Sequence, residues 1–538
     1  MKKKAAIFLL AVLLLFTMAM ATYGAGGKQA QSAPAKTITW ALGGQPEVLD
    51  PAMSNYLRAN AFMTTMFMGL VDIDKDGNVE KIYARDYTVS QDGMTWDFHL
   101  VPNAKWSDGV PLTAHHFEYG IKRMIDPANA SRAVANSFYL KNAERANKGE
   151  VPMSEVGVKA ISDTHLRFEL SGPYPYFVYI AAGTNFFPAR KDIIDRHGDA
   201  WTKTPQTYIG NGPFQAVAMS DLEYRLAKNP NFIKADDVKI DELKIVVMES
   251  QESHLAAYRM GDIDVTEDLS PEAINSFRNT PDLAPISRMG IVYFNFNHYK
   301  DPLKDVRVRK ALSMAINREQ IITRVLQLAH RPAFGLVPFG MPSLTNPARS
   351  FRDLAGDRFK EDVAEARRLL AEAGFPGGAG MRTLVFYTMN NQVDSDTAQA
   401  IQSMWKENLG VNCEINALDS RAYWAEQPNM DKYDIFRDSW NTGTPDPDSV
   451  LLVWEPQRQS YQSGYTNPEY DRLWAIQKGT ADPKIREDAF LAIEKLLIDD
   501  MALIPYYFRV DYMLIKPRTT GVFKTPGGHF RFHKAGLK

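Results

Sequence analysis

The feature that most constrains the fold is the interleaving of strand-like and helix-like patterns along the whole chain. Strand-like segments alternate apolar and polar residues, and helix-like segments place apolar residues three and four positions apart. The predicted strands are residues 37–42, 95–100, 165–170, 291–297, 383–388, 411–416, 433–437 and 504–517. The predicted helices are residues 59–70, 113–125, 308–316, 363–373 and 485–496. This mixture predicts an α/β or α+β protein.

The length of the chain indicates more than one compact part. At 538 residues, of which 45% are hydrophobic, the chain is too long for a single core. It has no repeat of fixed period and no low-complexity domain. We therefore expect two lobes that share the mixed architecture.

The first residues have the pattern of a secretory signal peptide. Lys2, Lys3 and Lys4 precede a run of 16 uncharged residues, 5–20, and small residues follow at Ala21 and Ala25. A membrane anchor is the alternative, but it needs about 20 apolar residues. We predict a signal peptide over residues 1–25 and a flexible leader over 26–36. Because no cysteine is present there for acylation, we expect a soluble periplasmic protein.

Composition argues against several classes of function. The net charge is −2, from 62 basic and 64 acidic residues, which gives no field to hold a nucleic acid. The single cysteine, Cys413, cannot form an internal disulfide, and we expect it to be a small core residue of its strand.

Motifs of catalysis and of metal or cofactor binding are missing from the sequence. It contains no GxSxG, GxxxxGK, GxGxxG, HExxH or paired CxxC pattern, so we predict neither an enzyme nor a bound cofactor or metal. His115 and His116 point about 100° apart on a helix, so they are predicted to be surface residues. Residues 446–448, Asp-Pro-Asp, are predicted to form a loop turn.

Several sequence strings resemble the family 5 extracellular solute-binding proteins, the oligopeptide- and dipeptide-binding receptors of bacterial ABC importers. Residues 96–100 (WDFHL), 104–109 (AKWSDG) and 111–119 (PLTAHHFEY) resemble the signature block of that family. Residues 210–214 (GNGPF), 258–264, 305–319, 364–375 and 405–411 are similar to its later blocks, in the same order. The resemblance covers about residues 37–520 and is closest to the oligopeptide branch.

The resemblance implies a particular fold. That fold is α/β, the two-lobed periplasmic-binding-protein fold (type II, large), with an extra α+β domain inserted in the first lobe. Lobe I would contain residues 37–79, 206–290 and 509–538, with the extra domain at 80–205 and lobe II at 291–508. The chain would cross between the lobes near Tyr293 and Tyr507, and a ligand would be enclosed when the lobes close.

The resemblance also implies the function. The protein would be a monomeric receptor that captures oligopeptides, or a similar small solute, and delivers them to permease subunits of an ABC transporter in the inner membrane. An alternative is a receptor of the same fold for a non-peptide solute, such as an oligosaccharide or an opine-like compound. An exported hydrolase on this scaffold is a further alternative, against which the missing nucleophile motif argues.

Carrying the family's binding residues over to this chain gives a mixed result. In the oligopeptide receptors, a strand like residues 433–440 carries an arginine, a tryptophan and, three positions later, an aspartate that pairs with the peptide amino terminus. Arg437 and Trp440 match, but the aspartate position is Gly443. Because a buried ammonium without a carboxylate is unfavourable, either another acid replaces the aspartate or the ligand lacks a free amino terminus.

The remaining candidate residues follow from these alternatives. The candidate acids are Asp446, Glu267 and Asp268, while Arg437 is expected either to bind a ligand carboxylate or to form a structural ion pair. Further binding residues implied by the resemblance are Asn55, Tyr56, Leu57 and Asn441, with Tyr293, Tyr507 and Arg509 on the hinge side.

Overall fold

The computed structural model describes residues 35–267, 269–455 and 463–538. The predicted signal peptide, most of the predicted leader and the candidate acid Asp268 lie outside these ranges. Across the described ranges, none of the helices combines the length and the apolar character that crossing a bilayer requires.

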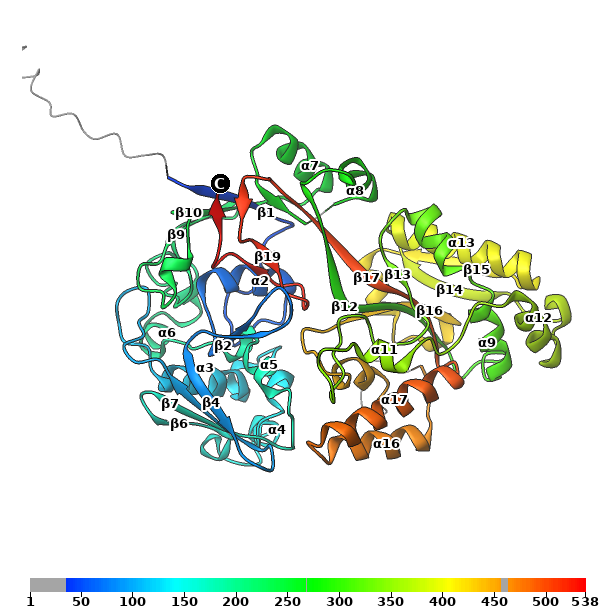
Figure 1. Cartoon of the computed structure of the whole chain (residues 1–538), viewed down its shortest axis with the longest axis horizontal. Helices are drawn as coiled ribbons and strands as arrows, with labels where there is room; N and C mark the ends of the chain where they lie inside the picture. Colours follow the sequence, from blue (N-terminus) through cyan, green and yellow to red (C-terminus); the bar gives the residue numbers. More distant parts are fainter. Residues whose placement is uncertain (1–34, 268, 456–462) are drawn as a thin grey trace, which may run out of the picture. The chain divides into compact units, whose positions relative to one another are not determined.

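A mixed β-sheet runs through the described residues, with two long strands near its middle (Figure 1). The long strands are β12 (Leu283–Phe296) and β17 (Leu503–Ile515), which pair antiparallel with each other. Listed across the sheet, the strands on the β12 side are β15 (Cys413–Leu418), β14 (Leu384–Met389) and β16 (Ile435–Asn441). On the β17 side they are β11 (Val265–Thr266), β1 (Thr37–Leu42), β10 (Glu242–Val247), β9 (Glu223–Lys228) and β8 (Phe214–Met219), and β13 (Arg331–Pro332) also pairs with β17.

The pairing of β12 with β17 changes partway along both strands. Residues 283–287 of β12 pair with residues 510–514, and residues 291–295 pair with residues 503–508. Arg288, Met289 and Gly290 therefore lie opposite the single residue Arg509, which makes a β-bulge. A bulge re-aims side chains and bends the strand, and this one brings several charged side chains to the same place.

Two large hydrophobic cores meet along these long strands. One core combines residues between Ile38 and Val265 with the C-terminal segment Met513–Ala535. The other combines residues between Ile274 and Tyr512. Since β17 contributes Met513 to the first core and Phe508 to the second, the long strands join two separately packed parts of the chain.

A separate antiparallel sheet is formed within residues 84–169. Its order is β4 (Ala84–Val89), β5 (Thr95–Leu100), β7 (His165–Glu169) and β6 (Val158–Ser162), and helix α3 (Ala114–Ile125) contacts it. Thr113 begins α3 as predicted, in a capping box with His116. His116 is half-buried at the beginning of this helix, and its Nδ1 accepts the Thr113 backbone N–H at 3.0 Å, so it also caps the helix.

The other helices pack around the sheets. They are α2 (Leu57–Met66), α4 (Ala143–Asn147), α5 (Phe177–Ala181), α6 (Lys191–His197), α7 (Gln251–Met260), α8 (Pro271–Phe277), α9 (Val306–Met314), α10 (Arg318–Gln320), α11 (Phe351–Ala355), α12 (Val363–Glu372), α13 (Gln392–Leu409), α14 (Ser420–Glu426), α15 (Asp448–Leu451), α16 (Pro468–Lys478) and α17 (Pro483–Asp499). The helix and strand patterns read from the sequence are confirmed as elements, with ends that differ by a few residues except for β12, which begins at Leu283 and not at residue 291. Cys413 is buried at the start of β15, as predicted.

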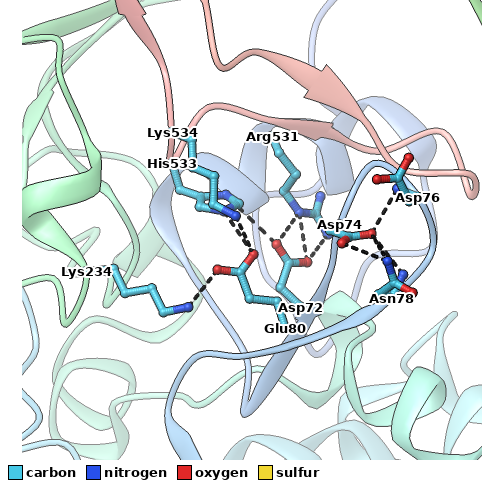
Figure 2. A network of polar contacts seen from close by, with 9 residues as sticks. All are labelled: Asp72, Asp74, Asp76, Asn78, Glu80, Lys234, Arg531, His533 and Lys534. Carbon is cyan, nitrogen blue, oxygen red and sulfur yellow. Dashed lines mark hydrogen bonds and ion pairs between the residues drawn. The ribbon is translucent and has the colours of Figure 1, made fainter.

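The C-terminal tail is fixed by a network of charges, which we call the tail network (Figure 2). Buried Arg531 donates to both carboxylate oxygens of buried Asp72, at 2.6–2.8 Å. Lys234 and Lys534 each lie 2.7 Å from Glu80. Asp72 and Glu80 lie on the hairpin of β2 (Val71–Ile73) and β3 (Val79–Lys81), so the network holds the tail against this hairpin.

Candidate functional site

A cavity of about 570 Å³ lies beside the bulge between β12 and β17, and we call it the cleft. This volume is within the range of small-ligand sites. Among the described residues, the lining comprises the following apolar and uncharged residues: Leu42, Gly43, Leu57, Ala61, Leu269, Pro271, Ile274, Leu328, Met389, Asn391, Val393, Ser439, Asn441, Tyr507, Val510, Tyr512 and Gly528. The charged or titratable lining residues are Arg58, Glu267, Arg288, His330, Asp394, Arg437, Arg509, Asp511 and Lys524.

One ion pair of the cleft joins β16 to the beginning of α13. Arg437 Nε donates to Asp394 Oδ1 at 3.0 Å, and Asn391 Nδ2 donates to the other oxygen at 2.8 Å. Burial works against the charge on Arg437, but the Asp394 carboxylate together with Tyr507, Tyr423 and Asp438 outweighs burial and raises the pKa of Arg437. Arg437 is thus permanently charged at the cleft wall, with its Nη1 only weakly engaged by Ser439 at 3.4 Å.

A larger cluster surrounds Asp511 on β17. Arg288 Nη1 donates to Asp511 at 2.6 Å, Arg509 Nη2 donates at 3.1 Å, and Lys524 Nζ lies 3.7 Å away. Burial alone would raise the pKa of Asp511, but these three cations lower it to about 2. Lys524 also pairs with Glu267, which belongs to the loop after β11. The three carboxylates that line the cleft among the described residues are therefore all paired with protein cations.

His330 and Tyr507 form an uncharged wall between the two ion-pair groups. Their rings stack with centroids 4.1 Å apart and an interplanar angle of 12°. His330 Nδ1 accepts the Val510 backbone N–H at 3.1 Å. Burial, followed by the nearby charge of Arg509, lowers the pKa of His330 to about 3, so its imidazole is neutral at physiological pH.

Six of the candidate binding residues line the cleft. They are Leu57, Glu267, Arg437, Asn441, Tyr507 and Arg509. Arg437 was expected either to form a structural ion pair or to bind a ligand carboxylate. It forms the ion pair with Asp394, and because it also lines the cavity, binding of a carboxylate stays a prediction.

The other six candidates are absent from the cleft lining of the described residues, and each contacts protein groups elsewhere. The Asn55 amide donates to the Arg132 carbonyl, and Arg132 donates to the Tyr56 hydroxyl at 2.6 Å. Trp440 Nε1 donates to the Ser449 carbonyl at 2.6 Å. Tyr293 is fully buried, with its ring centroid 5.5 Å from that of Trp454.

Gly443 packs closely against the C-terminal tail. A Cβ on Gly527 would come within 2.8 Å of Gly443 Cα, so the two glycines allow their backbones to touch. The Gly527 carbonyl in turn accepts Arg288 Nη2 at 2.9 Å. Tail backbone therefore lies beside the position where the family resemblance implies a carboxylate.

Asp446 lies in a turn, as predicted, but its side chain belongs to a buried network. Arg486 donates to both oxygens of Asp446, at 2.7 and 2.9 Å, and both side chains are almost fully buried. The Tyr176 hydroxyl donates to Asp448 at 2.6 Å. Burial, and next the charge of Asp446, raises the pKa of Asp448 to about 6. The turn prediction missed this burial, because residues 446–448 lead into α15 and are covered by α17 and by Tyr176.

Five charged cleft residues were not anticipated from the sequence: Arg58, Arg288, Asp394, Asp511 and Lys524. A signal existed for one of them. Arg509 and Asp511 are two positions apart on a predicted strand, so they share a face. The others come from α2, the bulge, α13 and the tail, which only the tertiary fold brings together.

Another cavity, of about 660 Å³, lies near residues 45–53, 128–132 and 199–203. Its most buried carboxylate, Asp50, already accepts Arg123 at 2.7 Å and the Trp201 indole at 3.2 Å. Its lining does not include the long strands β12 and β17. The cleft is the better candidate site because it draws on both packed parts of the chain and concentrates charge.

Comparison with known proteins agrees with this geometry. The sequence profile of the bacterial extracellular solute-binding proteins, family 5 (middle region), matches residues 78–462. The chain therefore belongs to this family of binding proteins.

Individual relatives cover nearly the whole chain. The oligopeptide-binding protein OppA of Bacillus subtilis (strain 168) is 28% identical and covers 100% of both chains. The probable deoxycholate-binding periplasmic protein YgiS of Escherichia coli (strain K12) is 29% identical over 91% of each chain. The solved structure of the E. coli murein tripeptide binding protein MppA superposes with a TM-score of 0.76 and 26% identity, covering 94% of this chain and 99% of that one. The α/β fold predicted from the resemblance is thus shown.

Proposed function

We propose that this protein is the receptor of an ABC importer, which captures oligopeptides in the cleft and delivers them to permease subunits in the inner membrane. The observation that carries the proposal is the cleft itself, a cavity of about 570 Å³ at the junction of the two long strands, in a chain of this family. Relatives named as oligopeptide- and dipeptide-binding proteins support peptides as the solute.

The proposal includes the division of the chain into two lobes. Lobe I comprises residues 37–79, 206–290 and 509–538, the extra domain 80–205 belongs with it, and lobe II is 291–508. The bulge at Arg288–Gly290 and the opposing Arg509 lie at these proposed boundaries, which supports a hinge there. Closure about the hinge would then change the cleft, as in other two-domain receptors.

The proposal also places the protein in the periplasm as a monomer that does not convert its ligand. Export by the signal peptide at residues 1–25 is tested by N-terminal sequencing of the protein recovered from the periplasm. A receptor without turnover should release a ligand of unchanged mass after prolonged incubation.

A mass spectrum of the small molecules released from the purified, denatured protein tests the solute class. Peptide masses are expected. Carbohydrate, opine or bile-acid masses in place of peptides would contradict the proposal and favour the second candidate, a non-peptide receptor. That candidate is supported by Gly443 and by the relative named as a probable deoxycholate-binding protein.

Arg437 is the residue we propose as the anchor of a ligand carboxylate. Arg437→Ala should weaken peptide binding by roughly 2–5 kcal/mol, measured by calorimetry. Asp394→Asn is the matched control, because it breaks the same ion pair while keeping the guanidinium. If both variants weaken binding equally, Arg437 serves only its structural pair.

A further inference from the structure

We propose that the cleft selects an anionic peptide that has no free ammonium group at its amino terminus. The inference rests on the proposed function and specifies its ligand. It follows from the balance of charge in the cleft, from the pairing of its carboxylates and from the backbone beside Gly443.

The cleft carries an excess of positive charge. Counted over the described residues, its lining includes five permanent cations, Arg58, Arg288, Arg437, Arg509 and Lys524, against three carboxylates, Glu267, Asp394 and Asp511. His330 adds no charge, because its pKa is lowered to about 3. A cavity with one sign of charge in excess attracts solutes of the opposite sign.

None of the three lining carboxylates is available to a ligand ammonium. Asp511 is surrounded by Arg288, Arg509 and Lys524, and Glu267 is paired with Lys524. Asp394 accepts from Arg437 and from Asn391. An ammonium entering the cleft would have to displace a protein cation from its partner, and like charges placed side by side cost several kcal/mol.

Donors with spare capacity, in contrast, are present. Arg58 is exposed at the beginning of α2 and forms no ion pair with a carboxylate of the described residues. Its guanidinium lies over the backbone of Gly44, where an added Cβ would be 3.1 Å from Nη1. The side chain of Arg509 keeps 32% of its surface exposed while it pairs with Asp511. These guanidiniums can bind carboxylates in bidentate geometry.

Within the part of the chain that the structure describes, the surroundings of Gly443 provide no substitute acid. Gly527 touches Gly443, and the Gly527 carbonyl is used by Arg288. The acid three residues further along, Asp446, is buried with Arg486. Among the described residues, the cleft carboxylates near this tail are Glu267 and Asp511, and Lys524 lies beside both.

The test is a binding comparison among four matched sets of tripeptides to pentapeptides, with glutamate or lysine at one internal position and with a free or acetylated amino terminus. Calorimetry on the purified full-length mature protein should give the tightest binding for acetylated glutamate peptides. The weakest binding should be for free-amino lysine peptides, with a gap of at least about tenfold.

Two variants separate the charge effect from folding. Glu267→Gln removes one negative charge beside Lys524 and should strengthen binding of the acetylated glutamate peptides, whereas Arg58→Ala should weaken it. Lys75→Ala, at an exposed position in the tail-side hairpin, is the control and should change neither.

The outcomes distinguish the inference from the function on which it rests. If free-amino peptides bind as tightly as their acetylated partners, or more tightly, the inference is wrong and the peptide receptor stands. If no peptide set binds, whether or not deoxycholate does, both the inference and the peptide function are wrong.

Discussion

The cleft and the tail network are both built from arginine, lysine and carboxylate side chains, but they differ in balance and in access. In the tail network, Asp72 and Arg531 are buried together and Glu80 is held by two lysines (Figure 2). None of the nine residues drawn there lines the cleft. In the cleft, cations outnumber carboxylates and the charges border a cavity of about 570 Å³.

The difference separates a structural use of charge from a binding use. A buried pair closed on all sides adds no recognition, and losing one partner leaves a buried charge uncompensated. A cluster with excess charge beside a cavity can attract a ligand of the opposite charge. The predictions below test whether the two regions respond to change in these different ways.

The largest expected effect is in the tail network. Arg531→Ala leaves the Asp72 carboxylate buried without its partner and should lower the free energy of unfolding by about 3–5 kcal/mol. Denaturant titration measures the change. Lys75→Ala, in an exposed pair of the same hairpin, should change it by less than about 0.5 kcal/mol. A small effect of Arg531→Ala would remove the distinction between the two regions.

The pH dependence of stability should show opposite signs for different buried acids. Burial raises the pKa of Asp448 to about 6, so the folded protein keeps this proton where the unfolded chain, with a pKa of about 3.9, has lost it. Stabilisation from Asp448 is therefore full below about pH 4 and is lost as the pH rises to about 6, by roughly 1–3 kcal/mol. Denaturation of Asp448→Asn over this range should lack that loss.

Glu80 in the tail network provides the opposite case. The imidazole of His533 3.7 Å away, and then Lys234 and Lys534, outweigh burial and lower the pKa of Glu80. Its contribution is present above the ordinary pKa of a glutamate and is lost as the pH falls below it. Asp163→Asn, which changes an exposed carboxylate, is the control for the predictions on Asp448 and Glu80. Its stability should depend on pH in the same way as that of the wild type.

A smaller effect is expected at the contact between Tyr176 and Asp448. Tyr176→Phe removes one buried hydrogen bond between α5 and α15 while keeping the ring, so it should lower the free energy of unfolding by about 0.5–1.5 kcal/mol. Because this bond joins the proposed extra domain to proposed lobe II, ligand affinity should fall with it. If Tyr176→Phe lowers the free energy of unfolding but leaves ligand affinity unchanged, the hydrogen bond between Tyr176 and Asp448 does not contribute to ligand binding.

The smallest effect on stability is expected at Arg58. Arg58→Ala removes an exposed side chain and should change the free energy of unfolding by less than about 0.5 kcal/mol. Its effect on the binding of anionic peptides should nevertheless be measurable by calorimetry. Equal affinities for the wild type and Arg58→Ala would show that excess charge at the cleft mouth does not contribute to binding.

Much of the fold was predictable from local pattern, and less of the site was. Residues 37–42 and 95–100 have the alternation of half-buried strands and form β1 and β5 with those bounds. Thr113 was identifiable as a helix cap from residue type and position. Such signals are local, because hydrophobic periodicity and capping depend on neighbouring residues.

The site depends on contacts between residues far apart in the sequence. Arg437 was predicted from the family resemblance, but its partner Asp394 lies 43 positions away on another element. Lys524 contacts Glu267 across 257 positions, in a tail that the tail network also holds in place. No local pattern encodes such pairings, which explains why Arg58, Arg288, Asp394 and Lys524 were missed.

Hydrogen–deuterium exchange with and without a saturating peptide tests most directly whether the cleft, and not another surface, holds the solute. The account predicts slower exchange of backbone amides in residues 288–292, 437–441 and 507–511. It predicts unchanged exchange in residues 71–81 and 530–534, where the charges are already satisfied. Protection confined to the second set of residues, with a peptide whose binding is independently measured, would contradict the account.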